Sequence, residues 1–260
     1  MRSRHPEGRP WGVSVTSNGM KAASTTVSAP APGRVLDLEA IDATLRDLQA
    51  HFREINELLK SRRDAIDDSL IANMVAGYDL VDRLVAEQLD LFAMGHLKLF
   101  LEMNAVVLCG RDKRERVQAA SHLAATEQRF YEQEGGGIRD IVEWYTRHRT
   151  ESPWKRAAGV YVRMLSEPEL FIEGNHRTGA LVMSYILARE GRPPFVLTAA
   201  DAKAYLDPST LITETRKHSL VAVFRLPKIK RYFAKFLKKH ADRKYLITTP
   251  TGGAVPRPTN

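Results

Sequence analysis

The stretch ELFIEGNHRTGA, residues 169–180, places two acids, an asparagine, a histidine, an arginine and two glycines between apolar flanks. The sequence that follows, RTGALVMSYILARE, is apolar nearly all round and predicts a buried helix that ends at Gly191 and two prolines. The polar stretch is therefore expected to be the loop that leads into this helix. A helix N-terminus presents unpaired amide groups and a positive dipole end, so the sequence predicts an anion site there.

The side chains of this loop supply the other groups that a magnesium polyphosphate needs. Arg177 offers a forked, permanently charged donor, and Asn175 offers a neutral one. Glu173 supplies a hard oxygen of the kind that Mg²⁺ takes alongside phosphates. Gly174 permits a ligand to approach the backbone closely. The backbone amides of residues 174–178, the last of them Thr178, are expected to face the loop.

The elements that position this loop are expected to be helices. Residues 35 to about 60 carry an apolar stripe spaced by four and three, typical of a core helix and compatible with a coiled-coil seam. A second helical segment spans about residues 67–104, with a break near Gly95, and shorter amphipathic segments are IRDIVEWYTRH and PWKRAAGVYVRML. No βαβ alternation or repeat is present, so the predicted class is all-α, a helical bundle with an N-terminal helical extension and a basic C-terminal helix.

The chain divides by composition into four parts. Residues 1–34 and 246–260 are rich in Ser, Thr, Gly and Pro and are expected to be a disordered leader and tail. Residues 35–65 are expected to form an N-terminal helix, and residues 66–245 the main domain. No run of 18 apolar residues, no secretory signal and a single cysteine, Cys109, predict a soluble cytoplasmic protein.

The net charge of +8 is concentrated in one segment. Residues 216–244 hold eleven Lys and Arg against one acid, Asp242, so the rest of the chain is slightly negative. The segment KIKRYFAKFLKKH, residues 228–240, sets apolar residues on one helical face with lysines around the rest. It can bind nucleic acid or an anionic membrane. We favour the other interpretation, a terminal helix docked on the core with a solvated basic face.

Residues 169–180 resemble the signature loop of the Fic/Doc (Fido) family, H-x-F-x-[DE]-G-N-[GK]-R followed by the core helix. Five positions match: Phe171, Glu173, Gly174, Asn175 and Arg177. The resemblance covers about 47 residues, 152–198, through a helix, the loop, the core helix and its exit. Members of the family mostly transfer AMP, or in the Doc branch phosphate, from a nucleotide to a hydroxyl group of a target protein.

The resemblance implies a role for each matched residue. Glu173 would bind Mg²⁺, the amides of residues 174–177 and the Asn175 side chain would hold the phosphates of ATP or another nucleotide, and Arg177 would clamp the distal phosphates. Phe171 would be a buried anchor. A target protein is also implied, but no residue identifies it, and homo-oligomers remain an option. Residues 105–115 lie roughly where the family has its target-positioning flap.

Three positions depart from the family pattern. Glu169 replaces the histidine that takes the proton from the attacking hydroxyl, Ala180 replaces a second arginine, and His176 replaces the central glycine. A carboxylate with a reference pKa of about 4.3 is a weak base at pH 7. Loss of a general base costs on the order of 10²–10⁴ in rate. Burial can raise the pKa of Glu169 and make it a better base, and it can also serve as a second metal ligand.

Three other residues are candidates for the missing base. His176 lies on the first turn of the helix, where the dipole lowers the pKa of an imidazole, so we favour a loop or phosphate-contacting role for it. His218 and Glu167 are weaker candidates. Three hypotheses follow: a nucleotide-binding Fic-type protein with weakened or lost AMP transfer, a protein-interaction module that binds no nucleotide, and an active transferase with Glu169 as its base.

Overall fold

The regular elements within the described residues, 33–247, of this computed structural model are all helices. The α-helices are α1 (Leu38–Leu58), α2 (Asp68–Ala86), α3 (Lys98–Cys109), α4 (Lys113–Gln118), α5 (Ala120–Glu132), α6 (Ile138–Arg147), α7 (Pro153–Leu165), α8 (Asn175–Arg189), α9 (Ala202–Thr213) and α10 (Leu220–Lys239). Short 3₁₀ helices cover Met94–His96 and Arg243–Tyr245. The predicted all-α class is confirmed.

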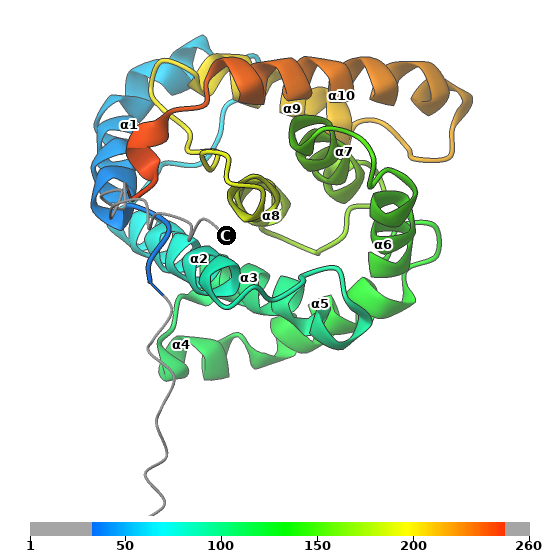
Figure 1. Ribbon diagram of the computed structural model, residues 1–260, viewed down its shortest axis with the longest axis horizontal. Helices are drawn as coiled ribbons and strands as arrows, with labels where there is room; N and C mark the ends of the chain where they lie inside the picture. Colours follow the sequence, from blue (N-terminus) through cyan, green and yellow to red (C-terminus); the bar gives the residue numbers. More distant parts are fainter. Residues whose placement is uncertain (1–32, 248–260) are drawn as a thin grey trace, which may run out of the picture. The chain divides into compact units, whose positions relative to one another are not determined.

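Helix α8 is the centre of the packing. Figure 1 shows it nearly end-on, with α2 and α3 on one side and α7 on the other, and these helices all pack against it. Every residue of α8 from Thr178 to Ala188 is buried, which the all-round apolar sequence predicts. At Gly179 an added Cβ would lie 2.7 Å from the ring of Tyr161, so this glycine lets α7 approach α8 closely.

Helix α1 is the predicted N-terminal helix. The side chain of Asp37 caps it by accepting a hydrogen bond from the backbone of Ala40 at 2.9 Å. Its apolar stripe is buried, at Ile41, Leu45, Leu48 and Phe52. Because α1 uses this stripe to pack on α2 and α9 of the same chain, it is a core helix, and the coiled-coil interpretation is wrong.

The predicted helix at residues 67–104 is two helices with a longer break than expected. Helix α2 ends at Ala86, Gln88 has a positive φ of 55°, and α3 begins only at Lys98. The hydroxyl of Tyr185 donates to Leu89 O at 2.6 Å and accepts from Leu91 N at 3.0 Å. A side chain of the central helix therefore satisfies backbone groups that the break leaves open.

The two ends of the described chain meet beside α1. Leu36 pairs with Leu246 in an isolated bridge, and Asp82 accepts the backbone N–H groups of Val35 and Leu36 at 2.7 and 2.8 Å. The predicted leader, 1–34, and the predicted tail, 246–260, lie outside the described residues except for residues 33–34 and 246–247. No helix in the described range is long and apolar enough to span a bilayer.

Helix α10 is the predicted basic C-terminal helix, but it starts at Leu220 rather than near residue 228. It packs on α7 and α9 through Ile229, Phe233, Phe236 and Leu237, which are buried. This confirms the predicted packing of its apolar stripe on the core, except that Tyr232 remains 41% exposed.

Candidate functional site

The loop between α7 and α8 ends at a glycine that the backbone requires. Gly174 has φ 76° and ψ 10°, in the left-handed region, and caps the N-terminus of α8. An added Cβ there would also lie 3.0 Å from the side-chain nitrogen of Asn104 on α3. That nitrogen donates to Glu173 O at 2.9 Å and to Thr178 Oγ1 at 3.1 Å. Helix α3 thus fixes the point at which the loop becomes helix.

The side chain of Asn175 is engaged inside the loop. Its Oδ1 accepts from Phe171 N at 2.9 Å, and its Nδ2 donates to Phe171 O at 2.9 Å and to Glu169 Oε2 at 2.6 Å. Both amide hydrogens are therefore used, and in this structure Asn175 braces the loop rather than offering a free donor to phosphate. Phe171 is fully buried and stacks on Phe130, as expected of an anchor.

Glu169 is half-buried beside this brace. Burial raises its pKa above the usual range, although Arg129, the hydrogen bond from Asn175 and Lys217 act in the opposite direction. The backbone carbonyl of Glu169 also accepts from Arg129 Nε at 3.0 Å. The carboxylate is directed at Asn175, and Glu169 does not line the pocket described below.

Three backbone amides at the N-terminus of α8 have no acceptor within residues 33–247: those of Asn175, His176 and Arg177. They lie at the positive end of the helix dipole and form the group that binds anions at helix N-termini. The predicted role of Thr178 is wrong, because its N–H donates to Gly174 O at 2.9 Å and its buried hydroxyl accepts from Asn104.

A pocket of about 410 Å³ opens beside these amides, between α1, α2, α8 and α9. Its volume is in the range of small-molecule sites, about 300–1,000 Å³. The walls are mainly apolar, and the charged side chains among them are two arginines, Arg63 and Arg177, and two acids, Asp64 and Glu173, with His176 beside them. Ala180, where the resemblance expects an arginine, also lines it. A larger hollow, about 760 Å³, beside the glycines at 135–137 holds Arg139 against three acids, which does not suit an anion.

Arg63 is the pocket residue that the sequence did not reveal. Its backbone is held on both sides by the Asn56 side chain, with hydrogen bonds of 2.8 Å. Its Nη2 donates to Thr210 Oγ1 at 2.9 Å, while its Nε is buried and has no acceptor in the described part of the chain. A fixed cation in the wall of a pocket is suited to attracting an anionic ligand. The adjacent Arg62 is exposed, and no sequence signal separates the two.

His176 is neutral in this arrangement. Ser209 Oγ donates to Tyr205 O at 2.6 Å, so the hydroxyl of Tyr161, 2.8 Å from Ser209 Oγ, must donate to it. Tyr161 then accepts from His176 Nδ1, 3.2 Å away, which leaves Nε2 as the unprotonated nitrogen. Burial lowers the pKa of His176 to about 4, and the charge of Arg63 acts in the same direction. His176 is thus a weak base at pH 7.

Arg177 and Glu173 form the outer edge of the pocket. Arg177 Nη1 donates to Val107 O at 2.7 Å, and its Nη2 lies 3.6 Å from Glu173 Oε1. The Glu173 side chain is 63% exposed. The described residues contain no cluster of three metal-ligating side chains. Because Mg²⁺ commonly takes one or two carboxylates together with substrate phosphates, Glu173 fits a metal that arrives with a nucleotide.

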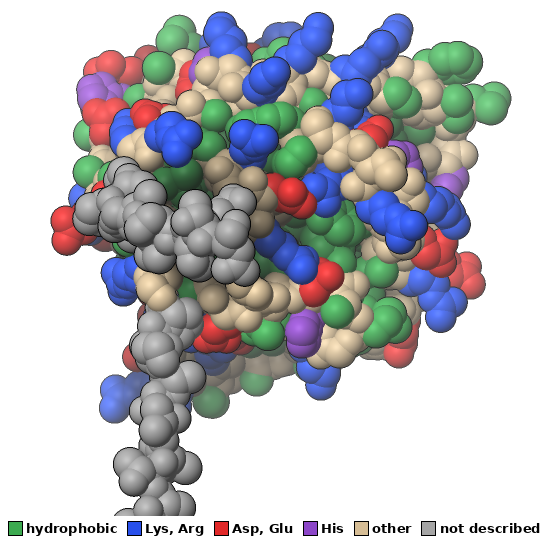
Figure 2. Space-filling model, in the orientation of Figure 1, with side chains coloured by type: hydrophobic (Ala, Val, Ile, Leu, Met, Phe, Trp, Pro, Cys, Tyr) green, Lys and Arg blue, Asp and Glu red, His purple; other side chains and the backbone are tan. Residues whose placement is uncertain are grey.

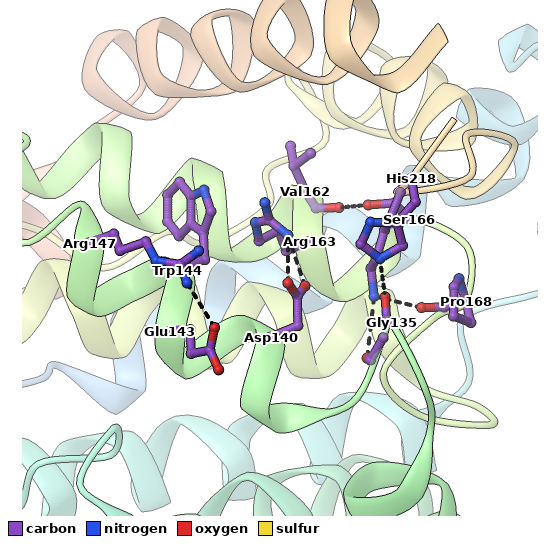
Figure 3. A network of polar contacts seen from close by, with 12 residues as sticks. Gly135, Asp140, Glu143, Trp144, Arg147, Val162, Arg163, Ser166, Pro168 and His218 are labelled. Carbon is purple, nitrogen blue, oxygen red and sulfur yellow. Dashed lines mark hydrogen bonds and ion pairs between the residues drawn. The ribbon is translucent and has the colours of Figure 1, made fainter. Parts of the chain in front are cut away.

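His218 and Glu167, the weaker candidates for the general base, lie near the loop but outside the pocket. Figure 3 shows the ring of His218 directed at Gly135, whose carbonyl lies 2.8 Å from Nε2, and the paired side chains of Asp140 and Arg163 nearby. Glu167 pairs with Arg216 on the surface at 3.1 Å. Neither His218 nor Glu167 lines the pocket.

Lys217, which the sequence did not single out, also supports the loop. Its Nζ donates to Pro168 O at 2.6 Å and to Gly136 O at 3.3 Å. Burial lowers the pKa of this lysine to about 8. The carbonyl of Pro168, the residue before Glu169, is thus held by the buried amine of Lys217.

The structure describes residues 105–115, the segment placed roughly at the position of the flap, but does not test that role. These residues are the end of α3 and the start of α4, separated by a tight turn at Gly110 and Arg111. Arg111 is held to Asp79 on α2 at 2.5 Å. The segment provides Val107 O, which positions the guanidinium of Arg177.

No family model matches the sequence, and neither does any curated protein. Among solved structures, the chain is similar to a Fic domain containing signaling protein from Bacteroides thetaiotaomicron, with 14% identity, 78% of each chain covered and a TM-score of 0.45. It is also similar to Fic-1 from C. elegans, with 20% identity over 78% of this chain and 62% of that one, and a TM-score of 0.40. Both are Fic proteins, the family that residues 169–180 resemble. With identities below 25% and TM-scores below 0.5, no residue role is transferred from either protein.

Proposed function

We propose that this chain is a Fic-type protein that binds ATP or a related nucleotide at the N-terminus of α8, and that its AMP transfer to protein hydroxyls is weakened or lost. One observation carries the proposal. The unpaired amides of Asn175, His176 and Arg177 open onto a pocket that also holds the cationic Arg63 and Arg177. A helix N-terminus together with two arginines is suited to phosphate groups.

The parts of a nucleotide match different regions of this pocket. The phosphates would meet the amides of α8, and the positive charge of Arg63, which lines the same pocket, would attract them. Glu173 would hold Mg²⁺ at the exposed edge, where the ion neutralises phosphate charge. The apolar walls, which include Phe52 and Leu206, would cover the nucleoside.

The position of Glu169 supports weak or absent transfer. A general base must come within hydrogen-bond reach of the hydroxyl from which it takes the proton. The Glu169 carboxylate is instead bonded to Asn175 in the loop interior, and it does not line the pocket. Without a positioned base, the transfer rate is expected to fall by about 10²–10⁴.

Calorimetric titration with ATP and Mg²⁺ tests the binding half of this proposal. Wild-type protein is expected to bind, and Arg63→Ala is expected to weaken binding by about 10- to 100-fold because it removes a charge-assisted hydrogen bond. Arg62→Ala is the matched control, since Arg62 is the exposed neighbour with the same charge. Absence of heat with ATP, GTP and CTP would refute the proposal and leave the interaction module as the better hypothesis.

A further inference from the structure

Helix α10 carries a row of cations that form no ion pair with any acid in residues 33–247. Its exposed basic side chains include Lys228, Arg231, Lys235, Lys238 and Lys239, and none has an ion-pair partner among the described residues. Lys230 differs, because it pairs with Glu151 at 2.5 Å and lies over the ring of Trp144. Figure 2 shows Lys and Arg side chains gathered along the edge of the molecule over α10. The local excess of positive charge therefore faces solvent.

The first two turns of the same helix expose large apolar side chains. Leu220 is 85% exposed and Phe224 is 72% exposed, and Val221 and Val223 are also mostly exposed. Figure 2 shows hydrophobic side chains gathered over this end of α10. Single exposed apolar residues are common, but four within five positions form a patch that indicates an interaction site.

The apolar patch and the cations share one face of the helix. At 100° per residue, Leu220, Phe224, Lys228, Arg231 and Lys235 fall on one side. The buried residues Ile229, Phe233, Phe236 and Leu237 fall on the opposite side. One continuous outward face is thus apolar at its N-terminal end and basic along the rest.

We propose that this outward face of α10 binds a membrane surface rich in anionic lipid. The basic row lies against the negatively charged headgroups, and Leu220 and Phe224 insert between them. The pattern differs from a spanning helix, because the helix stays docked on the core and lies in the plane of the interface. The proposal is independent of nucleotide binding, since α10 does not line the pocket.

Two other occupants fit this face less well. A second copy of the chain would bring two rows of unpaired cations together, and this repulsion opposes a dimer through α10. Nucleic acid would accept the cations, but it offers no apolar interior for Leu220, Val221 and Val223. Single-strand binding stacks successive bases on several aromatic side chains, whereas the basic part of this face, from Lys228 to Lys235, carries none in line with Phe224.

Sedimentation of the full chain with vesicles tests the proposal. Binding is expected to phosphatidylcholine vesicles that contain phosphatidylserine and not to pure phosphatidylcholine, and to weaken as salt is raised. Lys235→Glu with Lys238→Glu, and separately Leu220→Ser with Phe224→Ser, are each expected to weaken binding by at least about tenfold. All four side chains are exposed, so the fold is expected to survive, which circular dichroism verifies.

The matched controls lie on α4. Lys113→Glu changes an exposed charge, and Val117→Ser removes an apolar side chain that is 75% exposed. Both are expected to bind vesicles like the wild type. The proposal is overturned if phosphatidylserine does not increase binding of the protein to vesicles. It is also overturned if the Leu220 and Phe224 double variant binds these vesicles as well as the wild type. It is also overturned if the protein binds double-stranded DNA or RNA but not vesicles. The same holds if the wild type is a dimer and the Leu220 and Phe224 double variant is a monomer.

Discussion

The side-chain amide of Asn175 lies 2.6 Å from a carboxylate oxygen of Glu169. The same amide group holds the backbone of Phe171 through two further hydrogen bonds. One side chain therefore shapes the loop and also fixes the carboxylate that stands where the resemblance expects a histidine. The structure couples the stability of the loop to the position of its acid.

Replacement of Asn175 tests this brace. Asn175→Ala removes three hydrogen bonds and leaves buried backbone groups of Phe171 without partners. The free energy of unfolding is expected to fall by roughly 1–3 kcal/mol. Urea denaturation measures it, with the exposed Ile172→Ala as a control that changes stability by less than about 0.5 kcal/mol. Equal stability of the two variants would argue against the brace.

Restoring a histidine at position 169 tests the cause of weak transfer. Glu169→His is expected to raise labelling of proteins by α-labelled ATP by up to about 10²–10⁴ over the wild type. Glu169→Gln serves as the control, because it removes the charge without adding a base, and no gain is expected. If wild-type protein labels targets efficiently and Glu169→Gln abolishes this, Glu169 itself is the base and the weakened-transfer proposal fails.

The partly buried His176 makes stability depend on pH. Its pKa is lowered by burial to about 4, so between pH 6.5 and 4 the unfolded chain binds a proton that the folded chain does not. The free energy of unfolding therefore falls as the pH drops through this window, by roughly 3 kcal/mol at most. His176→Asn keeps an amide nitrogen near the Nδ1 position and is expected to remove this slope. Urea titrations at several pH values provide the comparison, and identical slopes would show that His176 is not buried as described.

Lys217 is expected to support the loop and to affect stability at high pH. Lys217→Met leaves the carbonyls of Pro168 and Gly136 without this donor, at a cost of roughly 1–3 kcal/mol at neutral pH. Since its pKa is lowered to about 8, the unfolded chain keeps a proton between pH 8 and 10.5 that the folded chain has lost. Stability contributed by Lys217 therefore rises with pH across this window. Lys228→Met, on the exposed face of α10, is the control and is expected to keep the wild-type change of stability with pH. The assignment is contradicted if Lys217→Met shows the wild-type change as well.

Much of the fold could be predicted because helical periodicity is a local property. The all-round apolar sequence after residue 177 gave the central helix, and the stripe from Ile41 to Phe52 gave α1. The predicted helix boundaries were wrong where side chains far away in the sequence determine them. The long break before α3 depends on Tyr185 of α8. Helix α10 begins at Leu220, before the apolar stripe from Ile229 onward that predicted this helix.

The site was predicted in part for the same reason. Free amides at the start of α8 follow from the position of Gly174, whereas the use of Thr178 and Asn175 inside the protein depends on Asn104 and the folded loop. Arg63 lies over one hundred residues from the loop in sequence. Its place in the pocket arises from the packing of α1 and α9, which a local pattern does not encode.

Backbone amide chemical shifts of a ¹⁵N-labelled sample, recorded while ATP and Mg²⁺ are added, test most directly where a nucleotide binds. The largest shifts are predicted for the amides of Asn175, His176 and Arg177, with a smaller response at the side-chain Nε of Arg63. Those shifts would locate the phosphates at the N-terminus of α8. Shifts confined to other surfaces, or none at saturating ATP, would contradict a nucleotide site at this helix.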